Sequence, residues 1–324
     1  MKKLIVAAAC VLAMAAGAAS AETYPSRPII IIVPFGAGGP TDVIARIIAE
    51  RMKVSLGEPI IVKNIGGVAG SIGVGHVASA APDGYTLSIG HWGTHAVNSL
   101  IYPLKYDVVK DFEPIALLAS NPYLIVSKNA VPVTDLKGLI AWLKANPDKA
   151  SASTNGPGSA GDLIGRHFRN VTGTSFQLVP YSGGSGASMQ DLLAGRIDLK
   201  FEQAALTLPL VQSGQVRAYA VTAKDRLAAA PEIPTVDEAG LPGFYISAWH
   251  GLWAPEGTPK AIVAKLNATV VEALADPTVL HRLANLGQEI PPRDAQIPEA
   301  LAKRQRAEIE KWRPIIKGTQ PELH

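Results

Sequence analysis

"IIIIVPFGAGGPTDVIARIIAERM", residues 29–52, joins an apolar run to a helix-like pattern through a loop rich in glycine and proline. The β-branched run over residues 29–33 predicts a buried strand, and the apolar periodicity over residues 42–52 predicts a helix. Glycine lets a backbone approach a ligand closely, and a helix N-terminus presents free N–H groups and a positive dipole end. The loop therefore predicts an anion-binding turn with Thr41 or Asp42 as the helix N-cap, whereas a plain tight turn is the alternative.

Strand-like and helix-like segments alternate along the chain, which predicts an α/β fold with a mostly parallel sheet covered by helices. Strands are expected at residues 29–33, 59–62, 85–89, 150–154, 177–180, 197–201 and 216–222. Helices are expected at residues 42–52, 71–79, 135–145, 162–171, 187–194, 260–275 and 299–311, and one more is expected to start at His95. Residues 116–128 are strand-like with a break at Asn121-Pro122, and residues 242–259 are expected to form a loop.

The alternation restarts after Asn121-Pro122, which predicts two lobes with a cleft between them. Residues 22–121 plus 224–324 would form a discontinuous α/β lobe 1, and residues 122–223 would form an inserted α/β lobe 2. Two chain crossings, near residues 119–123 and 219–225, would act as a hinge rather than a loose tether.

The first 21 residues are expected to be a secretory signal peptide. Lys2 and Lys3 precede a short apolar core, and small residues lead up to a cleavage site after Ala21. The apolar run is shorter than the ~20 residues that a membrane-spanning helix needs. Removing residues 1–21 from the 324-residue chain leaves 303 residues, and it also removes Cys10, the only cysteine. The exported protein, expected in the periplasm, would therefore have no disulfide and no thiolate site.

The charge balance argues against nucleic acid as a partner. The 30 Lys and Arg residues less Lys2 and Lys3 leave 28 basic residues against 27 acidic ones, so the net charge is near +1. No long basic run is present, and no other apolar run could span a membrane.

The glycine loop does not fit the nucleotide-binding motifs. The dinucleotide fingerprint needs a third glycine and an acidic residue after the second strand, and this chain has neither. The phosphate-binding Walker motif needs Gly-Lys-Ser/Thr, which is also missing. No cofactor is therefore expected.

Two further turns of the same kind lie in the middle of the chain. "TNGPGS" at residues 154–159 and "YSGGSG" at residues 181–186 each follow a predicted strand and precede a predicted helix. Three turns rich in Gly, Ser and Thr, distributed over two lobes, favour a shared binding function over three separate tight turns.

Long motifs of the sequence resemble those of the solute-binding proteins of tripartite tricarboxylate transporters, the Bug family. The quoted stretch, "VKNIGGVAGSIGVGHVASAAPDGYTL", "GTHAVNSLIY", "VPYSGGSGASMQDLLAGRIDL" and "IPTVDEAGLPGF" occur in the family's order, and Pro34-Phe35-x-Ala37-Gly38-Gly39-x-x-Asp42 is the most specific part. The resemblance implies a two-lobed, type II Venus-flytrap fold that closes on a small organic carboxylate. It also implies a monomer that delivers this ligand to the integral-membrane subunits of a transporter.

The resemblance also implies which residues bind the ligand, mainly through backbone N–H groups and bridging waters. In lobe 1 they are Phe35, Gly38, Gly39, Thr41, Asp42, Thr94 and His95; in lobe 2 they are Thr154, Gly156, Gly158, Ser159, Gly183 and Gly184. Many relatives carry Phe-Asp where this chain has Phe201-Glu202, so Glu202 is expected to alter the reach and charge of one wall. Arg46 and Arg166 fall within predicted helices, and no Arg clamp is expected.

An exported hydrolase is the competing class of function. Residues 157–161 and 183–187 nearly match Gly-x-Ser-x-Gly, but the histidines give no ordered triad, so no catalytic residue is expected. His91 and His95 have a spacing that suits a metal on a helix, but Gly93 indicates a turn, so no metal is expected. A sensor that presents its closed form to a signalling partner is a third class, which the sequence does not separate from transport.

Overall fold

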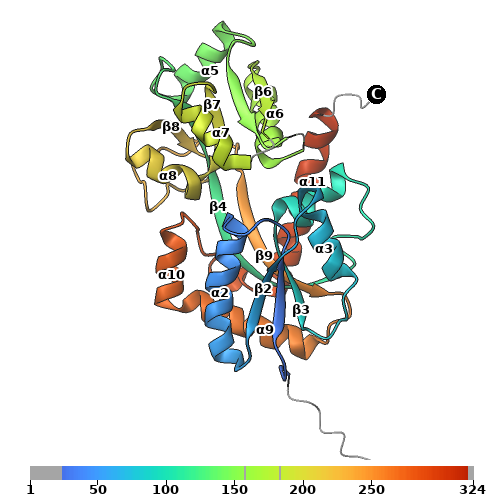
Figure 1. Cartoon of the computed structure of the whole chain (residues 1–324). Coiled ribbons are helices and arrows are strands. Elements are labelled where there is room, and N and C mark those ends of the chain that lie inside the picture. The colour runs from blue at the N-terminus through green and yellow to red at the C-terminus, as the bar shows by residue number, and fades with distance from the viewer. Residues whose placement is uncertain (1–23, 157, 182–183, 320–324) are drawn as a thin grey trace, which may run out of the picture.

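The computed structural model of the chain describes residues 24–156, 158–181 and 184–319. Its strands and helices form two α/β lobes, with two long strands running between them (Figure 1). The expected signal peptide, residues 1–21, and one expected ligand-binding residue, Gly183, lie outside the described residues.

The strands follow one hydrogen-bonded order, β2-β1-β3-β9-β4-β7-β5-β6, and β8 pairs with β4. They are β1 (Ile29–Val33), β2 (Ile60–Asn64), β3 (Thr86–His91), β4 (Phe112–Lys128), β5 (Ser151–Thr154), β6 (Gln177–Pro180), β7 (Leu199–Gln203), β8 (Val216–Val221) and β9 (Ser247–Pro255). The β1–β3 strands run parallel to one another, as do β5, β6 and β7, whereas β4 and β9 are antiparallel to their neighbours.

The helices cover the sheet, and most of them connect consecutive strands. They are α2 (Pro40–Leu56), α3 (Ser71–Ala78), α4 (Asn98–Ile101), α5 (Leu136–Ala145), α6 (Ala160–Thr172), α7 (Gly184–Leu193), α8 (Ala204–Gln212), α9 (Lys260–Ala275), α10 (Pro277–Ala284) and α11 (Pro298–Thr319), with the short turns η1 (Val68–Gly70), η2 (Gly93–Val97, a π-helix) and η3 (Arg293–Ala295). The β1–β3 strands, α2, α3, α9 and α10 lie in the first lobe, and β5–β8 with α5–α8 lie in the second (Figure 1).

The β4 strand runs through both lobes without the break that was expected at Asn121-Pro122, so that expectation is wrong. Its residues 112–122 pair with β9, and its residues 123–128 pair with β7 and β8. Proline donates no N–H and is tolerated in a strand where the ladder changes. Here the partners change directly after Pro122. The division into residues 22–121 plus 224–324 and residues 122–223 stays a prediction.

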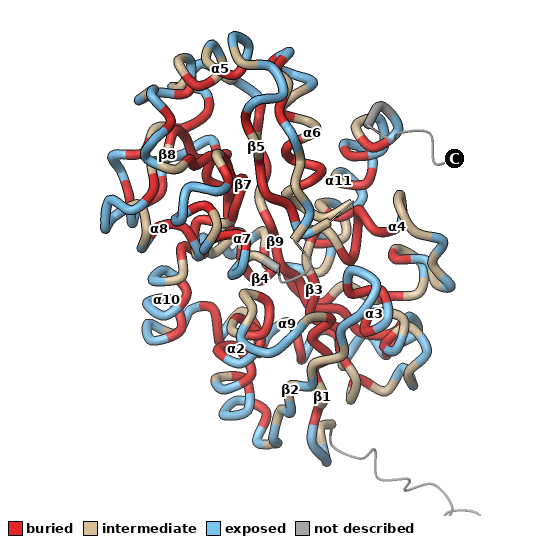
Figure 2. Tube along the Cα trace, turned by 45° about the horizontal axis from the view of Figure 1, so that its top comes forward, coloured by how far each residue is buried: buried red, intermediate tan, exposed pale blue. Residues whose placement is uncertain are grey.

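The expected loop at residues 242–259 is also wrong, because its central part forms β9. This strand lies between β3 and β4, and nearly all of its residues are buried. Trp249 and Trp253 are fully buried and pack in the interior, so neither forms a rim of the cleft. In Figure 2 the central strands are largely buried, and the helices around them have both buried and exposed residues.

Helix α11 links the two lobes from the side. It packs against β4 and against α6, and its buried Trp312 stacks on Trp92 with the ring centroids 4.9 Å apart. The helix expected at residues 299–311 is therefore part of a longer helix, with one face exposed and the other face in the core.

Candidate functional site

A cavity of about 920 Å³ lies where loops of the two lobes face each other. Its walls come from the ends of strands, where ligands usually bind in open α/β sheets. Residues 35–41 follow β1, and residues 91–93 lie at the end of β3. Across the cavity lie residues 153–155 and 158–161, around the end of β5, and residues 200–203 of β7. The volume falls in the range of small-molecule sites.

The structure brings most of the expected residues to this cavity, but not all of them. Those that line it are Phe35, Gly38, Gly39, Thr41, Thr154, Gly158, Ser159 and Glu202. The expected residues Asp42, Thr94, His95 and Gly156 are not among its lining residues, and Gly184 is the first residue of α7.

The N-cap of α2, at the end of the first-lobe glycine turn, is not the residue that was expected. The N-cap of α2 is Gly39, which has no side chain to cap with, so the expected Thr41 or Asp42 cap is wrong. Pro40 occupies the first helical position, which has no use for a donor N–H. The N–H groups of Gly39 and Thr41 have no hydrogen-bond partner within residues 24–156, 158–181 and 184–319. They are therefore donors that an anion in the cavity can use.

Asp42 supports this turn from behind. Its Oδ2 accepts hydrogen bonds from the Gly38 N–H (2.8 Å) and from Arg46 Nε (3.0 Å), and its Oδ1 accepts from Asn64 Nδ2 (2.9 Å). Only 2% of the residue is exposed. Burial alone would raise the pKa of the Asp42 carboxyl, but the hydrogen bonds from Arg46, Gly38 and Asn64 outweigh it and lower the pKa.

The second lobe repeats this arrangement. Gly158, like Gly38, has a positive φ (76° and 79°), and its N–H donates to Asp162 Oδ2 at 3.0 Å. Arg166 Nε lies 3.0 Å from both oxygens of Asp162. The sequence contains the same spacing, Gly-x-x-x-Asp-x-x-x-Arg, at residues 38–46 and 158–166. This repeat was not used in predicting the site. We call each of these a Gly–Asp–Arg brace.

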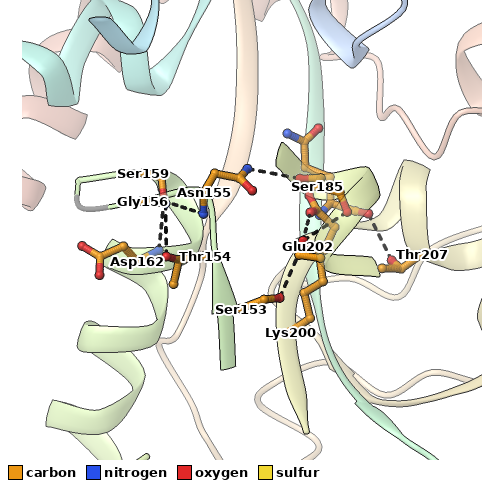
Figure 3. A network of polar contacts seen from close by, with 12 residues as sticks. Ser153, Thr154, Asn155, Gly156, Ser159, Asp162, Ser185, Lys200, Glu202 and Thr207 are labelled. Carbon is orange, nitrogen blue, oxygen red and sulfur yellow. Dashed lines mark hydrogen bonds and ion pairs between the residues drawn. The ribbon is translucent and has the colours of Figure 1, made fainter. Parts of the chain in front are cut away.

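The end of α6 presents donors like those of α2. Ser159 is its N-cap, and Ser159 Oγ accepts from the N–H groups of Asn155 (3.2 Å) and Asp162 (3.4 Å) (Figure 3). The N–H groups of Ala160 and Gly161 have no partner among the residues that the structure describes. Asn155 Nδ2 also donates to Ser185 Oγ (3.2 Å), which ties this turn to α7.

A buried ion pair forms part of the second-lobe wall. Lys200 Nζ lies 3.2 Å from Glu202 Oε2, and the two side chains are 2% and 8% exposed. Lys200 also donates to Ser188 Oγ (2.6 Å) and Ser153 Oγ (3.5 Å), and Glu202 Oε1 accepts from the Gln203 N–H (3.0 Å) (Figure 3). The charge of Glu202 is therefore balanced within the wall. Lys200 was not among the expected site residues. It could have been, because Lys200 and Glu202 are two residues apart on a strand, and such residues lie on the same face.

Thr94 and His95 lie behind the first-lobe wall. Both are fully buried, and Thr94 Oγ1 lies 3.0 Å from His95 Nδ1 and accepts from the His91 N–H at 3.1 Å. The His95 ring stacks on Trp253 at 3.8 Å, and burial lowers the pKa of His95 to about 3. These residues fix the end of β3 against β9. Within the described residues, no group of three His, Cys, Asp or Glu side chains suits a metal ion.

Comparison with known proteins identifies the family of this chain. Residues 44–320 match the family described as the tripartite tricarboxylate transporter family receptor. The chain belongs to this family. Of the helices that the structure describes, none has the length and apolar character needed to cross a bilayer.

Three solved structures show the same fold at substantial identity. The periplasmic binding protein BugD is 39% identical, with a TM-score of 0.80, over 91% of this chain and 98% of its own. MatC of Rhodopseudomonas palustris, solved with malate, is 38% identical with a TM-score of 0.81 (90% and 100% covered). Rpa4515 of R. palustris, solved with adipate, is 34% identical with a TM-score of 0.82 (91% and 97% covered).

Replacing Asp42 with asparagine is expected to lower the free energy of unfolding by about 1.5–3 kcal/mol, because hydrogen bonds to a buried charge are lost. The folded-state pKa of Asp42 is lowered, so its stabilisation is present above pH 3.8, its ordinary value, and disappears as the pH falls through the lowered pKa. The difference between the Asp42→Asn variant and wild type should therefore narrow below that pH. Urea unfolding at several pH values measures it.

Asp83 provides the matched control for this variant. It pairs with Arg27 at the surface, where the side chains are 58% (Arg27) and 41% (Asp83) exposed, so Asp83→Asn should cost less than ~1 kcal/mol. Equal stability of the two variants would show that the Asp42 brace contributes nothing beyond a surface pair.

Proposed function

We propose that this protein captures a small organic carboxylate in the cavity between its lobes and delivers it to the membrane subunits of a tripartite tricarboxylate-type transporter. The observation that supports this most is the pair of Gly–Asp–Arg braces. Each brace holds a left-handed glycine in place, and each is followed, at the start of a helix that borders the same cavity, by two N–H groups that have no partner among the described residues. Binding of malate by MatC and adipate by Rpa4515 supports a carboxylate as the ligand.

The chemistry of capture rests on backbone groups. The N–H groups of Gly39 and Thr41 would bind a carboxylate from the first lobe, and those of Ala160 and Gly161 would bind it from the second, directly or through water. The positive ends of the α2 and α6 dipoles add attraction for an anion. Because the donors belong to both lobes, a bound ligand would stabilise the closed arrangement, and opening would release it.

The side chains that line the cavity fit this mode of recognition. Among the described lining residues, the charged ones are Lys200 and Glu202, which neutralise each other. Arg46 and Arg166 pair with the brace aspartates and are not among the lining residues. An anion would thus be held without a fixed guanidinium, which allows tight but reversible binding.

The proposal also covers where the protein acts and what it does not need. The protein is exported by the signal at residues 1–21, is cleaved after Ala21, and acts in the periplasm as a monomer. It needs no cofactor or metal, does not bind nucleic acid and is not an enzyme.

The hydrolase alternative receives little support from the structure. Ser159 Oγ is occupied in capping α6, and Ser185 Oγ accepts from Asn155. Among the described residues, no histidine is hydrogen-bonded to either hydroxyl, so neither has the general base that a nucleophilic serine needs.

A carboxylate ligand is expected to stabilise the folded protein. At 100 times its dissociation constant it should add about 2.7 kcal/mol to the free energy of unfolding. A thermal-shift screen of mono-, di- and tricarboxylates, including malate and adipate, tests this on protein that has been unfolded and refolded to remove co-purified ligand. If every acid leaves the melting temperature unchanged, the proposed function is wrong.

A further inference from the structure

His91 holds a position in the first-lobe wall that the expected ligand contacts do not include. It is the last residue of β3, is half-buried and lines the cavity. Its ring stacks on Phe35 with centroids 4.8 Å apart and an angle of 15°, and it meets the edge of His250 at 5.8 Å and 88°. The plane of the imidazole is therefore fixed from two sides, and one of these neighbours, Phe35, belongs to the glycine turn.

The hydrogen bond to Gly93 determines which ring nitrogen carries the proton. The Gly93 N–H donates to His91 Nδ1 at 2.8 Å, so Nδ1 acts as an acceptor. A neutral imidazole with an accepting Nδ1 carries its hydrogen on Nε2. A Cβ on Gly93 would come within 2.6 Å of His91 Cε1, so glycine at this position permits the close approach.

The ring stays neutral over the ordinary pH range. Burial lowers the pKa of His91 to about 4. The titratable groups packed against it are His250 from β9 and His95 from η2, and burial lowers the pKa of both. Residues 34–39 of the glycine turn carry no titratable side chain. No neighbouring charge in these elements therefore favours the imidazolium.

The other ring nitrogen of His91, Nε2, carries the hydrogen and can donate it. Within residues 24–156, 158–181 and 184–319, no hydrogen bond to His91 Nε2 is formed, and this atom is not among the fully buried unpaired ones. A donor in a cavity wall needs an acceptor from water or from a ligand. We propose that His91 binds the ligand as a neutral Nε2–H donor to an acceptor oxygen, in particular a carboxylate oxygen.

This inference rests on the proposed function and adds to it a residue that selects the ligand. A neutral donor on a rigid ring favours oxygen acceptors and disfavours an ammonium group at this wall. It also differs from a protonated histidine clamp, because its contribution stays constant between pH 5.5 and pH 8.

Two substitutions separate the two ring nitrogens. In His91→Gln the amide NH₂ can take the place of Nε2–H, whereas His91→Asn keeps a polar group near the Nδ1 position only. With malate and adipate as probes in calorimetry, His91→Asn should lose at least tenfold in affinity and His91→Gln should stay within about threefold of wild type. The exposed His76 gives the control, and His76→Asn should match wild type.

Nuclear magnetic resonance of ¹⁵N-histidine-labelled protein tests the tautomer without any ligand. We expect an unprotonated Nδ1 and a protonated Nε2 in His91, with Nε2 shifting when malate or adipate is added and affinity unchanged from pH 8 to pH 6.5, where both acids remain dianions. A protonated Nδ1, equal affinity of His91→Asn and wild type, or affinity that rises as His91 gains a proton would overturn the inference alone. If wild-type protein binds neither acid, the contact and the proposed function fail together for these ligands, while the tautomer measurement still stands.

Discussion

Valine at position 38 is expected to weaken carboxylate binding at least tenfold, or by ~1.4 kcal/mol, while the protein remains folded. Gly38 has φ of 79°, a left-handed conformation that is strained for a β-branched residue. A Cβ there would meet nothing within 4 Å, so the cost comes from the backbone and not from crowding. Relaxing this strain would move the Gly38 N–H from Asp42 and reorient the adjacent donors.

Gly39 provides the matched control, although nothing in the sequence distinguishes its expected role from that of Gly38. Its φ is −75° and its ψ is 167°, which any residue adopts, and an added Cβ would lie an ordinary 3.5 Å from the Gly36 oxygen. Gly39→Ala should therefore cost less affinity than Gly38→Ala, and both less than Gly38→Val. Calorimetry measures the affinities, and circular dichroism confirms folding. Wild-type affinity in Gly38→Val would mean that the turn is only a connection.

Replacing Lys200 with methionine is expected to lower the free energy of unfolding by about 3–5 kcal/mol, because it leaves the buried Glu202 carboxylate without its partner. Lys200 is 2% exposed and Glu202 is 8% exposed, so water compensates little. The double variant Lys200→Met/Glu202→Met should recover most of this loss, since replacing both members of a buried pair is often nearly neutral. Urea unfolding of the single and double variants measures the coupling between the two side chains.

A surface pair shows how much of this effect is due to burial. Arg226 and Glu238 are 43% and 46% exposed, and Arg226→Met should cost less than ~1 kcal/mol. If Lys200→Met is no more costly than Arg226→Met, the pair in the cavity wall is not the stabilising contact that its geometry indicates.

The parts of the fold that the sequence predicts well are those with strong local signals. The strands at residues 29–33 and 177–180 and the helix at residues 260–275 have the expected bounds. The β9 strand was missed because a strand buried on both faces has no alternation, and its flanking glycines and prolines resemble a loop. The α8 helix was also missed, because it contains Pro209, and a proline weakens a helical pattern. The α10 helix was missed because it is short, although Asp276 as the N-cap followed by a proline indicates a helix start.

The sequence predicts the position of the candidate site, but not the side chains that hold its turns in place. Glycine turns after strands indicate where an anion can approach the backbone, and the cavity lies at these turns. The role of Asp42 behind the turn depends on Arg46 and on Asn64, which is distant in sequence. The pairing of Lys200 with Glu202 depends on both lying on one face of β7, which a residue-by-residue comparison with a family motif does not consider.

A crystal structure of the protein with a bound carboxylate such as malate tests the central claim most directly. We expect carboxylate oxygens at ~2.7–3.2 Å from the backbone nitrogens of Gly39 or Thr41 in one lobe and of Ala160 or Gly161 in the other, or joined to them by a single water. A ligand held mainly by a bidentate arginine, or bound outside the cavity between the lobes, would contradict it.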